Sequence, residues 1–431
     1  MQTSNALARF NLDDRADFCE PFRCEIPEWS EGIVSERIGL FMHVFFSVGE
    51  PSGDQHAAHL IGELRHRIPQ LRVSGFGGPL MERAGCQLLF PLTTMAVMGV
   101  FQVLPLIAKF FRLLKEADQY FERHKPDLVV LVDFPGFNWW VAHKAKRRGI
   151  PVIYYLPPQL WAWAPWRIKK VRRNIDLVLS GLNFETDWYA ERGIPVMYVG
   201  HPFFDEVADH KLDASFCREW KSTSGQTVAL LPGSRRQEVT RSWPLILDAA
   251  RRLHAKYPNI NFLVANYKES QRQFCVAEYE KLQETLPISF FVGKTPEIIE
   301  LADCAVMVSG SVSLEMLARR TPAVVLYRTT WPTYLIAKSL VTVNMMSLPN
   351  LIAGRKVMPE YLSVGSPTPV INSIVEDVDR WLSDSQNLAN ARHQLEQVRE
   401  QIYVTGATAR TAEVIADRLL QSVAKRESVA A

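Results

Sequence analysis

Apolar, strand-like runs alternate with amphipathic helical patterns along most of this chain. Between residues 38 and 199 the runs are GLFMHVFFSV, RVSGFGG, DLVVLVD, PVIYYL, DLVLSG and PVMYVG, separated by helical segments such as HAAHLIGELRHR. Runs that stay apolar throughout are typical of parallel strands, which carry helices on both faces of their sheet. The pattern therefore predicts an α/β fold built on a parallel sheet.

A second series of the same kind follows a polar stretch at 208–226. Its runs are TVALL, NINFLVAN, ISFFVG, CAVMVSG and PAVVLYR, and a charged helical tail begins near residue 373. A chain of 431 residues is long for a single core. We therefore predict two Rossmann-like domains that face a cleft, at 38–202 and 203–405, with an extension at 1–37 and a C-terminal helix and tail at 406–431.

Composition narrows the functional classes. Hydrophobic residues make up 47% of the chain and charged residues 22%, which indicates a globular protein. The net charge of +3 gives no indication of nucleic-acid binding, and six scattered cysteines are typical of a reducing compartment. The leader has no basic and apolar regions of the kind that make a secretory signal.

Ligands of open parallel sheets bind beyond the carboxyl ends of the strands, so the loop after each predicted strand is a candidate site. The first such loop, in VFFSVGEPSGDQHAAHL, has the strand–turn–helix order of a nucleotide-binding fold, yet it carries Glu50 and Asp54. Carboxylates repel phosphate groups. This loop is therefore predicted to serve another ligand.

The loop in ALLPGSRRQE, at 229–238, has the opposite charge. Gly233 permits a close approach, Ser234 is expected to cap the next helix, and Arg235 adds positive charge at the helix N-terminus. The alternative is an ordinary capped helix with solvated arginines. We predict that a nucleotide diphosphate binds here.

Another strand–turn–helix unit occupies AVMVSGSVSLE, at 305–315. Its Gly310 and Ser311 suit contacts with phosphate or ribose. Glu315 either accepts hydrogen bonds from a ribose diol or only supports its helix. A capping box would need Ser or Thr three residues earlier, where Val312 stands.

Asp133 ends the apolar strand in LVVLVDFPGFNWW and precedes Pro135 and Gly136, so we expect its carboxylate to face the cleft. Burial raises the pKa of a carboxyl group toward the range that suits a general base. Capping of the next helix is the alternative, although Asn138 could supply that cap. We take Asp133 as the base.

Two segments combine apolar and basic residues. LWAWAPWRIKKVRR could contact single-stranded nucleic acid, a membrane interface or the core, and the near-neutral charge disfavours nucleic acid. The apolar run at 91–108 is interrupted by Gly99 and Pro105 and is too short to span a bilayer. It lies either on a membrane surface or in the core. His56 and His59 alone do not make a metal site, and no metal is predicted.

Nine segments, in order, resemble the lipid-A-disaccharide synthase family, an inverting glycosyltransferase family of the two-Rossmann GT-B architecture. They are VGEPSGD, GFGGPLMERAG, VMGVFQVLP, LVDFPGFN, LWAWAPWRIKK, FETDWYAERGIPVMYVGHP, LLPGSRRQEV, SGSVSLE and MSLPNLIAGRKVMPE, and the resemblance covers about residues 41–362. The chain departs from the family pattern at Gly136, where a second Asp is usual, and at Pro157 and Pro51.

The resemblance implies transfer of 2,3-diacylglucosamine from UDP to the 6-hydroxyl of 2,3-diacylglucosamine 1-phosphate, which gives a β-1,6 disaccharide 1-phosphate. It also implies a peripheral enzyme on the cytoplasmic face of the inner membrane that needs no metal or other cofactor, and it leaves a homodimer open. The rival hypotheses are a UDP-sugar epimerase or another lipid-linked-sugar transferase of the same fold, and a catalytically silent membrane-associated binding protein.

The candidate residues fall into four groups. The catalytic base is Asp133. The UDP-binding residues are Gly233, Ser234, Arg235, Gly310, Ser311, Glu315 and Asn350, the last two of which match UDP-site positions of the family. The acceptor-binding residues are Glu50, Ser52, Asp54 and Asn138. The membrane or acyl-chain contacts are Val97, Met98, Val100, Phe101, Val103, Leu104, Phe110, Phe111, Trp161 and Trp163.

Overall fold

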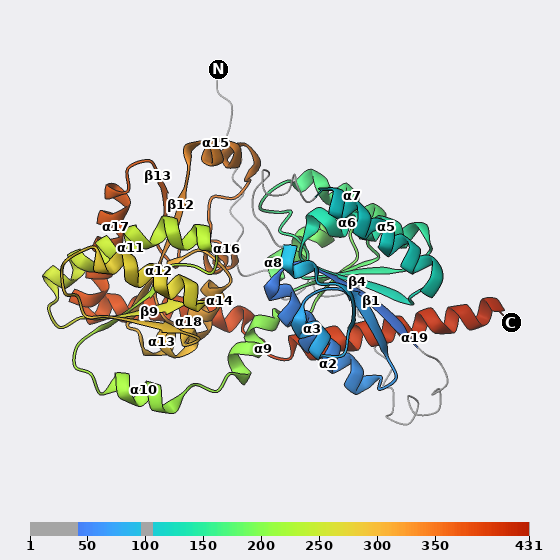
Figure 1. Cartoon of the computed structure of the whole chain (residues 1–431), viewed down its shortest axis with the longest axis horizontal. Coiled ribbons are helices and arrows are strands. Elements are labelled where there is room, and N and C mark those ends of the chain that lie inside the picture. The colour runs from blue at the N-terminus through green and yellow to red at the C-terminus, as the bar shows by residue number, and fades with distance from the viewer. Residues whose placement is uncertain (1–41, 96–106, 431) are drawn as a thin grey trace, which may run out of the picture. The chain divides into compact units, whose positions relative to one another are not determined.

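The computed structural model describes residues 42–95 and 107–430, which form two parallel sheets with helices on both faces of each (Figure 1). The first sheet has the order β3-β2-β1-β4-β5-β6-β7 and the second the order β10-β9-β8-β11-β12-β13. All the ladders of both sheets are parallel. The predicted α/β architecture of two Rossmann-like units is confirmed.

The strands of the first sheet are β1 (His43–Val48), β2 (Arg72–Phe76), β3 (Gln87–Phe90), β4 (Leu128–Val132), β5 (Val152–Tyr155), β6 (Leu177–Ser180) and β7 (Val196–Tyr198). Those of the second sheet are β8 (Thr227–Leu231), β9 (Asn261–Asn266), β10 (Ile288–Val292), β11 (Cys304–Val308), β12 (Ala323–Thr329) and β13 (Glu360–Val364). The central strands β1, β4, β8 and β11 are buried along their whole length, which explains their unbroken apolar sequences.

The helices up to β7 are α2 (Pro51–Arg67), α3 (Pro79–Arg83), α5 (Ile107–His124), α6 (Pro135–Arg147), α7 (Ile168–Asn174) and α8 (Asn183–Ala190). The later helices are α9 (Pro202–Asp209), α10 (Ala214–Lys221), α11 (Arg236–Lys256), α12 (Glu269–Glu280), α13 (Thr295–Leu301), α14 (Val312–Arg319), α15 (Trp331–Leu340), α16 (Leu348–Ala353), α17 (Thr368–Ser383), α18 (Ser385–Ile402) and α19 (Ala407–Ala430). No helix in the described ranges is long and apolar enough to cross a membrane.

The C-terminal helix α19 packs on the first sheet, although it follows the strands of the second. Its Ala412, Ile415 and Leu419 are buried in the same core cluster as β1 and α2, and Figure 1 shows α19 beside α2. The carboxylate of Asp205, in α9, accepts hydrogen bonds from the N–H groups of Gly406, Ala407 and Thr408 at the start of α19. Helix α9 therefore anchors the returning chain next to α2.

Candidate active site

A strained turn follows β4 and carries Asp133. Asp133 and Phe134 have φ values of 46° and 47°, in the left-handed region that non-glycine residues rarely adopt. Each such residue costs on the order of 1–3 kcal/mol, so the surrounding structure must hold the turn in place. Gly49 makes room for it, because a Cβ at position 49 would lie 2.2 Å from the Phe134 ring.

The side chain of Asn138 holds this turn from inside. Its Nδ2 group donates to the carbonyl oxygens of Ser47, Val132 and Asp133, at 3.1, 3.2 and 2.8 Å, and its Oδ1 accepts from the Ser47 hydroxyl at 2.6 Å. The Tyr154 hydroxyl also donates to the Asp133 carbonyl oxygen, at 2.7 Å. Asn138 was predicted to bind the acceptor, but it is fully buried and its amide is occupied by main-chain groups. Its observed role is to position Asp133.

The carboxyl group of Asp133 is held in an electrostatic environment that suits a base. Burial is the main cause that raises its pKa, to about 6; the charge of Glu50 raises it further and that of His56 lowers it. Burial also raises the pKa of Glu50, and the positive charge of Arg235 opposes that rise. The side chain of Glu50 makes no capping bond at the start of α2. Glu50 belongs to a loop of the first sheet and Arg235 to a loop of the second. Their opposite charges therefore interact between the two sheets.

A cavity of about 340 Å³ lies next to Asp133. It lies at the carboxyl ends of β4, β5, β6 and β11, where both sheets contribute loops. Predicted residues from both substrate sites line it, among them Asp133, Ser52, Gly310 and Ser311. The remaining lining residues are His56, Leu156, Pro157, Pro158, Gln159, Gly181, Leu182, Glu185, His201, Ser309, Met346, Leu348 and Leu351.

Asp54, predicted to contact the acceptor, has a different place. Its buried carboxylate accepts hydrogen bonds from the N–H groups of Gly78, Leu80 and Met81, at 3.0 to 3.1 Å. These bonds hold the turn between β2 and α3. In the opening loop, the groups that remain available to a ligand are therefore Glu50 and Ser52 rather than Asp54.

The predicted anion site at the start of α11 contains a carboxylate of the chain itself. Oε2 of Glu238 accepts from the N–H groups of Ser234 and Arg235, at 3.2 and 3.1 Å, and Oε1 lies 2.8 Å from Nη1 of Arg235. The N-cap residue of α11 is Arg235, not the predicted Ser234, and Glu238 accepts from its N–H as the third residue of the helix. Gly233 has a φ of +117°, and a Cβ there would lie 2.8 Å from Cβ of Glu238. The donors expected for a diphosphate are thus present and satisfied internally.

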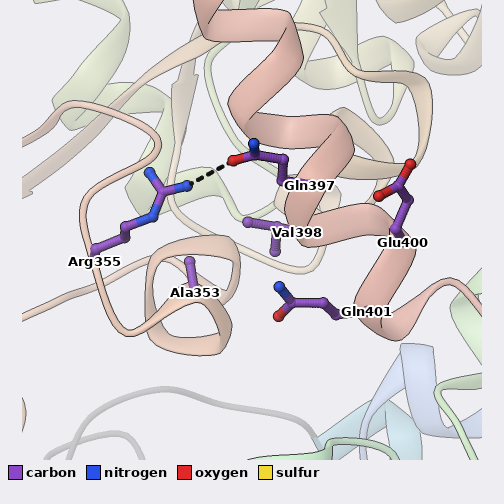
Figure 2. Close-up of a pocket in the computed structure, with 6 residues that line it drawn as sticks. All are labelled: Ala353, Arg355, Gln397, Val398, Glu400 and Gln401. Atoms are coloured by element: carbon purple, nitrogen blue, oxygen red, sulfur yellow. Dashed lines mark hydrogen bonds between the residues drawn. The ribbon is translucent and has the colours of Figure 1, made fainter. Parts of the chain in front are cut away.

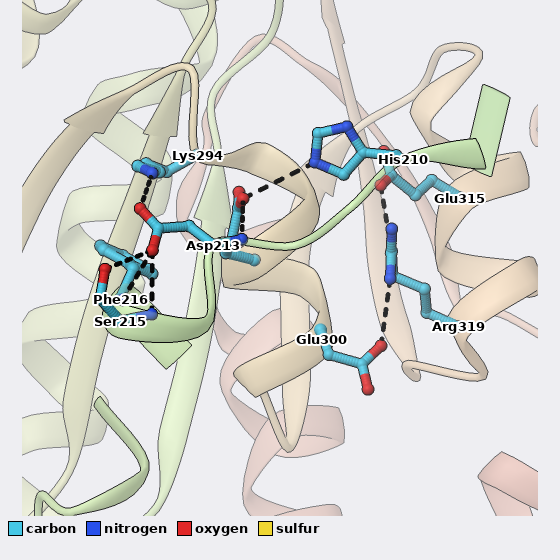
Figure 3. Close-up of polar contacts among 9 residues, drawn as sticks. His210, Asp213, Ser215, Phe216, Lys294, Glu300, Glu315 and Arg319 are labelled. Carbon is cyan, nitrogen blue, oxygen red and sulfur yellow. Dashed lines mark hydrogen bonds and ion pairs between the residues drawn. The ribbon is translucent and has the colours of Figure 1, made fainter. Parts of the chain in front are cut away.

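Glu315, the predicted ribose contact, is buried in α14 and paired with Arg319. Nε of Arg319 lies 3.1 Å from Oε1 of Glu315, and Nη1 lies 3.2 Å from Glu300 (Figure 3). Burial raises the pKa of Glu315, while Arg319 and the charge of His210 oppose the rise. Figure 3 places His210 beside this pair. The ion pair occupies part of the Glu315 carboxylate. This contact agrees with the alternative prediction, that Glu315 supports its own helix.

Asn350, predicted to contact UDP, is fully buried in α16. Its Oδ1 accepts from the N–H groups of Val357 and Met358, and its Nδ2 donates to the Met358 carbonyl oxygen. The amide therefore fastens α16 to the segment that leads into β13. It shapes the chain near Leu348 and Leu351, which line the cavity.

The predicted membrane contacts divide into three sets. Val97, Met98, Val100, Phe101, Val103 and Leu104 lie outside the described residues. Phe111 is 65% exposed, whereas Phe110 packs on the rings of Phe134 and Phe137. Trp161 is buried and donates to Glu185, and Trp163 stacks with the Arg167 guanidinium. Trp161 therefore belongs to the core and not to a membrane contact.

Three titratable residues at the cavity were not predicted as site residues. Burial raises the pKa of Glu185 to about 7, and its carboxylate accepts from Ser180 and Trp161. His201 is partly buried, and desolvation lowers its pKa to about 3. His56 was considered only as a metal ligand. The sequence offered a signal for Glu185 and His201 only, since FETDWY and GHP belong to segments that resemble the family.

Two further features of the described residues bear on the site. No group of three or more His, Cys, Asp or Glu side chains there could hold a metal ion. A second cavity of about 340 Å³ lies between Ala353, Arg355 and α18, where Arg355 bonds to Gln397 (Figure 2). It holds no residue predicted for catalysis.

Comparison with known proteins identifies the family. A model of lipid-A-disaccharide synthetase matches residues 44–414. The lipid-A-disaccharide synthase of Myxococcus xanthus is 37% identical over 86% of this chain and 96% of its own length, and that of Geobacter metallireducens is 32% identical over 87% and 97%.

Solved structures share the fold at low identity. The UDP co-structure of S. aureus MnaA has a TM-score of 0.60 at 12% identity and covers 87% of this chain and 96% of that one. The calicheamicin glycosyltransferase CalG4 has a TM-score of 0.56 at 12% identity over 89% and 99%. The family model matches most of this chain, and the synthases of Myxococcus xanthus and Geobacter metallireducens align with most of it as well. The chain therefore belongs to the lipid-A-disaccharide synthase family of glycosyltransferases.

Proposed function

We propose that this chain joins UDP-2,3-diacylglucosamine to 2,3-diacylglucosamine 1-phosphate, releasing UDP and forming the β-1,6-linked disaccharide 1-phosphate. The family and the names of its relatives support the reaction class. The observation that carries the proposal is the position of Asp133, whose pKa is raised to about 6 in a cavity lined by loops of both sheets. A base is needed where the two substrates meet.

In the proposed reaction, the Asp133 carboxylate removes the proton from the 6-hydroxyl of the acceptor. The oxygen then attacks the anomeric carbon as the bond to UDP breaks, which inverts the configuration there. A carboxylate with a pKa near 6 is ionised at neutral pH and still basic enough to assist. Glu50 and Ser52, on the same side, are the proposed contacts to acceptor hydroxyl groups, which donate to carboxylates.

Departure of UDP places negative charge on the diphosphate. The proposed stabilising groups are Arg235, the N–H groups at the start of α11, and the turn at Gly310 and Ser311. For the diphosphate to reach the α11 donors, the Glu238 carboxylate must leave them. Positive charge from side chains and helix ends serves in place of a metal ion, so we expect activity to continue in a chelator.

Both proposed substrates carry acyl chains, which we propose remain in the cytoplasmic face of the inner membrane. The exposed ring of Phe111 on α5, beside basic residues of the same helix, is the described feature that supports a peripheral contact. A peripheral location explains how the sugar groups reach the cavity while the acyl chains stay in lipid.

The test is a radiolabel assay with purified protein, UDP-2,3-diacylglucosamine and 2,3-diacylglucosamine 1-phosphate in mixed micelles. We expect UDP and a tetraacyl disaccharide 1-phosphate in equal amounts, with and without chelator. Epimerisation of the UDP-sugar without acceptor would instead identify the epimerase alternative. Absence of any turnover, with UDP still bound, would favour the silent binding protein.

A further inference from the structure

Helix α15, in the unit of the second sheet, presents an apolar sequence to solvent. Its sequence WPTYLIAKSL is mostly apolar, yet none of its described side chains is buried. Trp331 is 58% exposed and Leu335 is 61% exposed, and Leu340 and Val341 at the end of the helix are exposed as well. Figure 1 shows α15 at the rim of its unit. An exposed apolar surface of this kind is typical of a contact with a partner or a membrane.

The chain that follows α15 joins this surface to the first sheet. Val341 forms an isolated antiparallel bridge with Trp163. The N–H group of Thr342 donates to the carbonyl oxygen of Ala162 at 2.8 Å. The exposed end of α15 therefore lies beside the Trp-rich loop of the first unit, where Trp166 is 57% exposed.

Both segments that meet at this bridge lack acidic residues. The sequence has no Asp or Glu at 134–175 and none at 316–359. Exposed basic side chains of these segments, such as Lys170, Arg173 and Lys338, form no ion pair with any residue of the described ranges. Tryptophan favours the headgroup level of a bilayer, and basic side chains are attracted to anionic lipids. The composition of the surface therefore matches an anionic membrane.

The same two segments also form walls of the cavity described above. Pro157 and Gln159, just before the Trp-rich loop, line that cavity. So do Met346 and Leu348, which follow α15 and its bridge. The exposed apolar surface and the site for the sugar groups are thus successive parts of the same two stretches of chain.

We propose that α15 is a second membrane-contact surface and docks, together with the Trp-rich loop, on the anionic lipids of the bilayer. Every membrane contact predicted from the sequence belongs to the first unit, whereas α15 belongs to the second. With α15 on the lipid, both units contact one bilayer, and the acyl chains of the two proposed substrates stay in it. The inference rests on the peripheral location in the proposed function and not on the reaction itself.

Vesicle flotation of the whole chain, without substrate, tests this surface. The vesicles contain phosphatidylglycerol and phosphatidylcholine, or phosphatidylcholine alone. Leu335→Ser should lower the partition coefficient on the order of tenfold, because one exposed apolar side chain no longer enters the lipid. Lys338→Gln should lower it about fivefold, only with phosphatidylglycerol and only at low salt. Tyr267→Ser, the control, removes a 63% exposed ring from the loop after β9 and should bind as wild type does.

The Tm should stay at the wild-type value in all three variants, since each side chain is exposed. Wild-type partitioning of Leu335→Ser would overturn the proposal, and a lower solution mass of that variant would then assign α15 to a contact with a second copy. A lower Tm for Leu335→Ser, or an equal loss of binding in Tyr267→Ser, would also overturn it. A wild-type chain that binds no vesicles would refute the peripheral location itself. Vesicle binding without disaccharide formation would refute only the proposed reaction.

Discussion

Replacing Asn138 by Asp tests how the turn at Asp133 is held, with almost no change in shape. The Nδ2 group now donates to three main-chain oxygens, those of Ser47, Val132 and Asp133. In Asn138→Asp an acceptor faces the same oxygens. The new carboxyl group must therefore stay protonated, or else repel three carbonyl groups in a buried site.

The size of the effect follows from these contacts. Loss of two hydrogen bonds costs about 0.5–1.5 kcal/mol each, and an unsatisfied buried polar group adds about 1–3 kcal/mol. We therefore expect the free energy of unfolding to fall by about 2–6 kcal/mol at neutral pH. The two left-handed residues add strain on the order of 1–3 kcal/mol each, so a released turn relaxes away from its present geometry.

The stability of Asn138→Asp should depend on pH, and the direction follows from the pKa of the new carboxyl group. Burial among carbonyl groups raises the folded-state pKa of the new carboxyl group above its unfolded value of about 4. Its protonated form is therefore tolerated at low pH, and stability is lost as pH rises from about 4, by up to about 1.4 kcal/mol per unit. Asn138→Ala should be destabilised without this added slope.

The assay is urea unfolding of wild type and both variants between about pH 5 and 8, with kcat measured under the same conditions. We expect kcat of Asn138→Asp to fall while the remaining folded protein still binds UDP. If Asn138→Asp matched the wild-type stability at every pH, the amide would not hold the turn, and the explanation of how Asp133 is positioned would be refuted.

Three further predictions follow from the site. Glu50→Gln removes a charge that raises the pKa of Asp133. The acid limb of the plot of kcat/KM against pH should therefore move below about pH 6. An unchanged limb would mean that Asp133 is not the titrating group. Glu238→Ala should lower stability by about 1 kcal/mol through loss of a cap and raise UDP affinity, measured by calorimetry; weaker UDP binding would contradict competition for the α11 donors. Phe111→Ser should reduce binding to anionic vesicles at unchanged Tm, whereas Phe110→Ser should lower Tm; unaltered vesicle binding in the first would exclude Phe111 from the contact.

The sequence was sufficient to predict the fold because most strands are buried on both faces and so read as continuous apolar runs. The strands β3 and β13 were not predicted. Both lie at sheet edges and are partly exposed, and their sequences QLLF and EYLSV mix polar and apolar residues. The packing of α19 on the first sheet was also missed, because its apolar face indicates burial but not which sheet covers it.

The sequence was sufficient to place a residue at the cavity where that residue directly follows a buried strand. Asp133 and the Gly310–Ser311 turn follow buried strands, and both line the cavity. Asp54, Asn138 and Asn350 also belong to polar motifs, but their hydrogen bonds go to main-chain groups that only the folded chain brings near.

The same limit applies to long-range pairs. Glu206 and His56 are far apart in sequence, and neither residue shows a partner until α9 and α2 meet. Glu185 is similar, because its raised pKa depends on burial beside Trp161 and Ser180. Side chains that act through such pairs are therefore the part of the site that sequence analysis does not reach.

The most direct test of the account is single-turnover product formation by Asp133→Asn, with UDP affinity measured on the same preparation. Removal of a general base should slow the chemical step by about 10²–10⁴-fold while UDP binds as tightly as in wild type. Disaccharide formation at the wild-type rate would contradict the assignment of Asp133 as the base, and with it the mechanism built on the turn after β4.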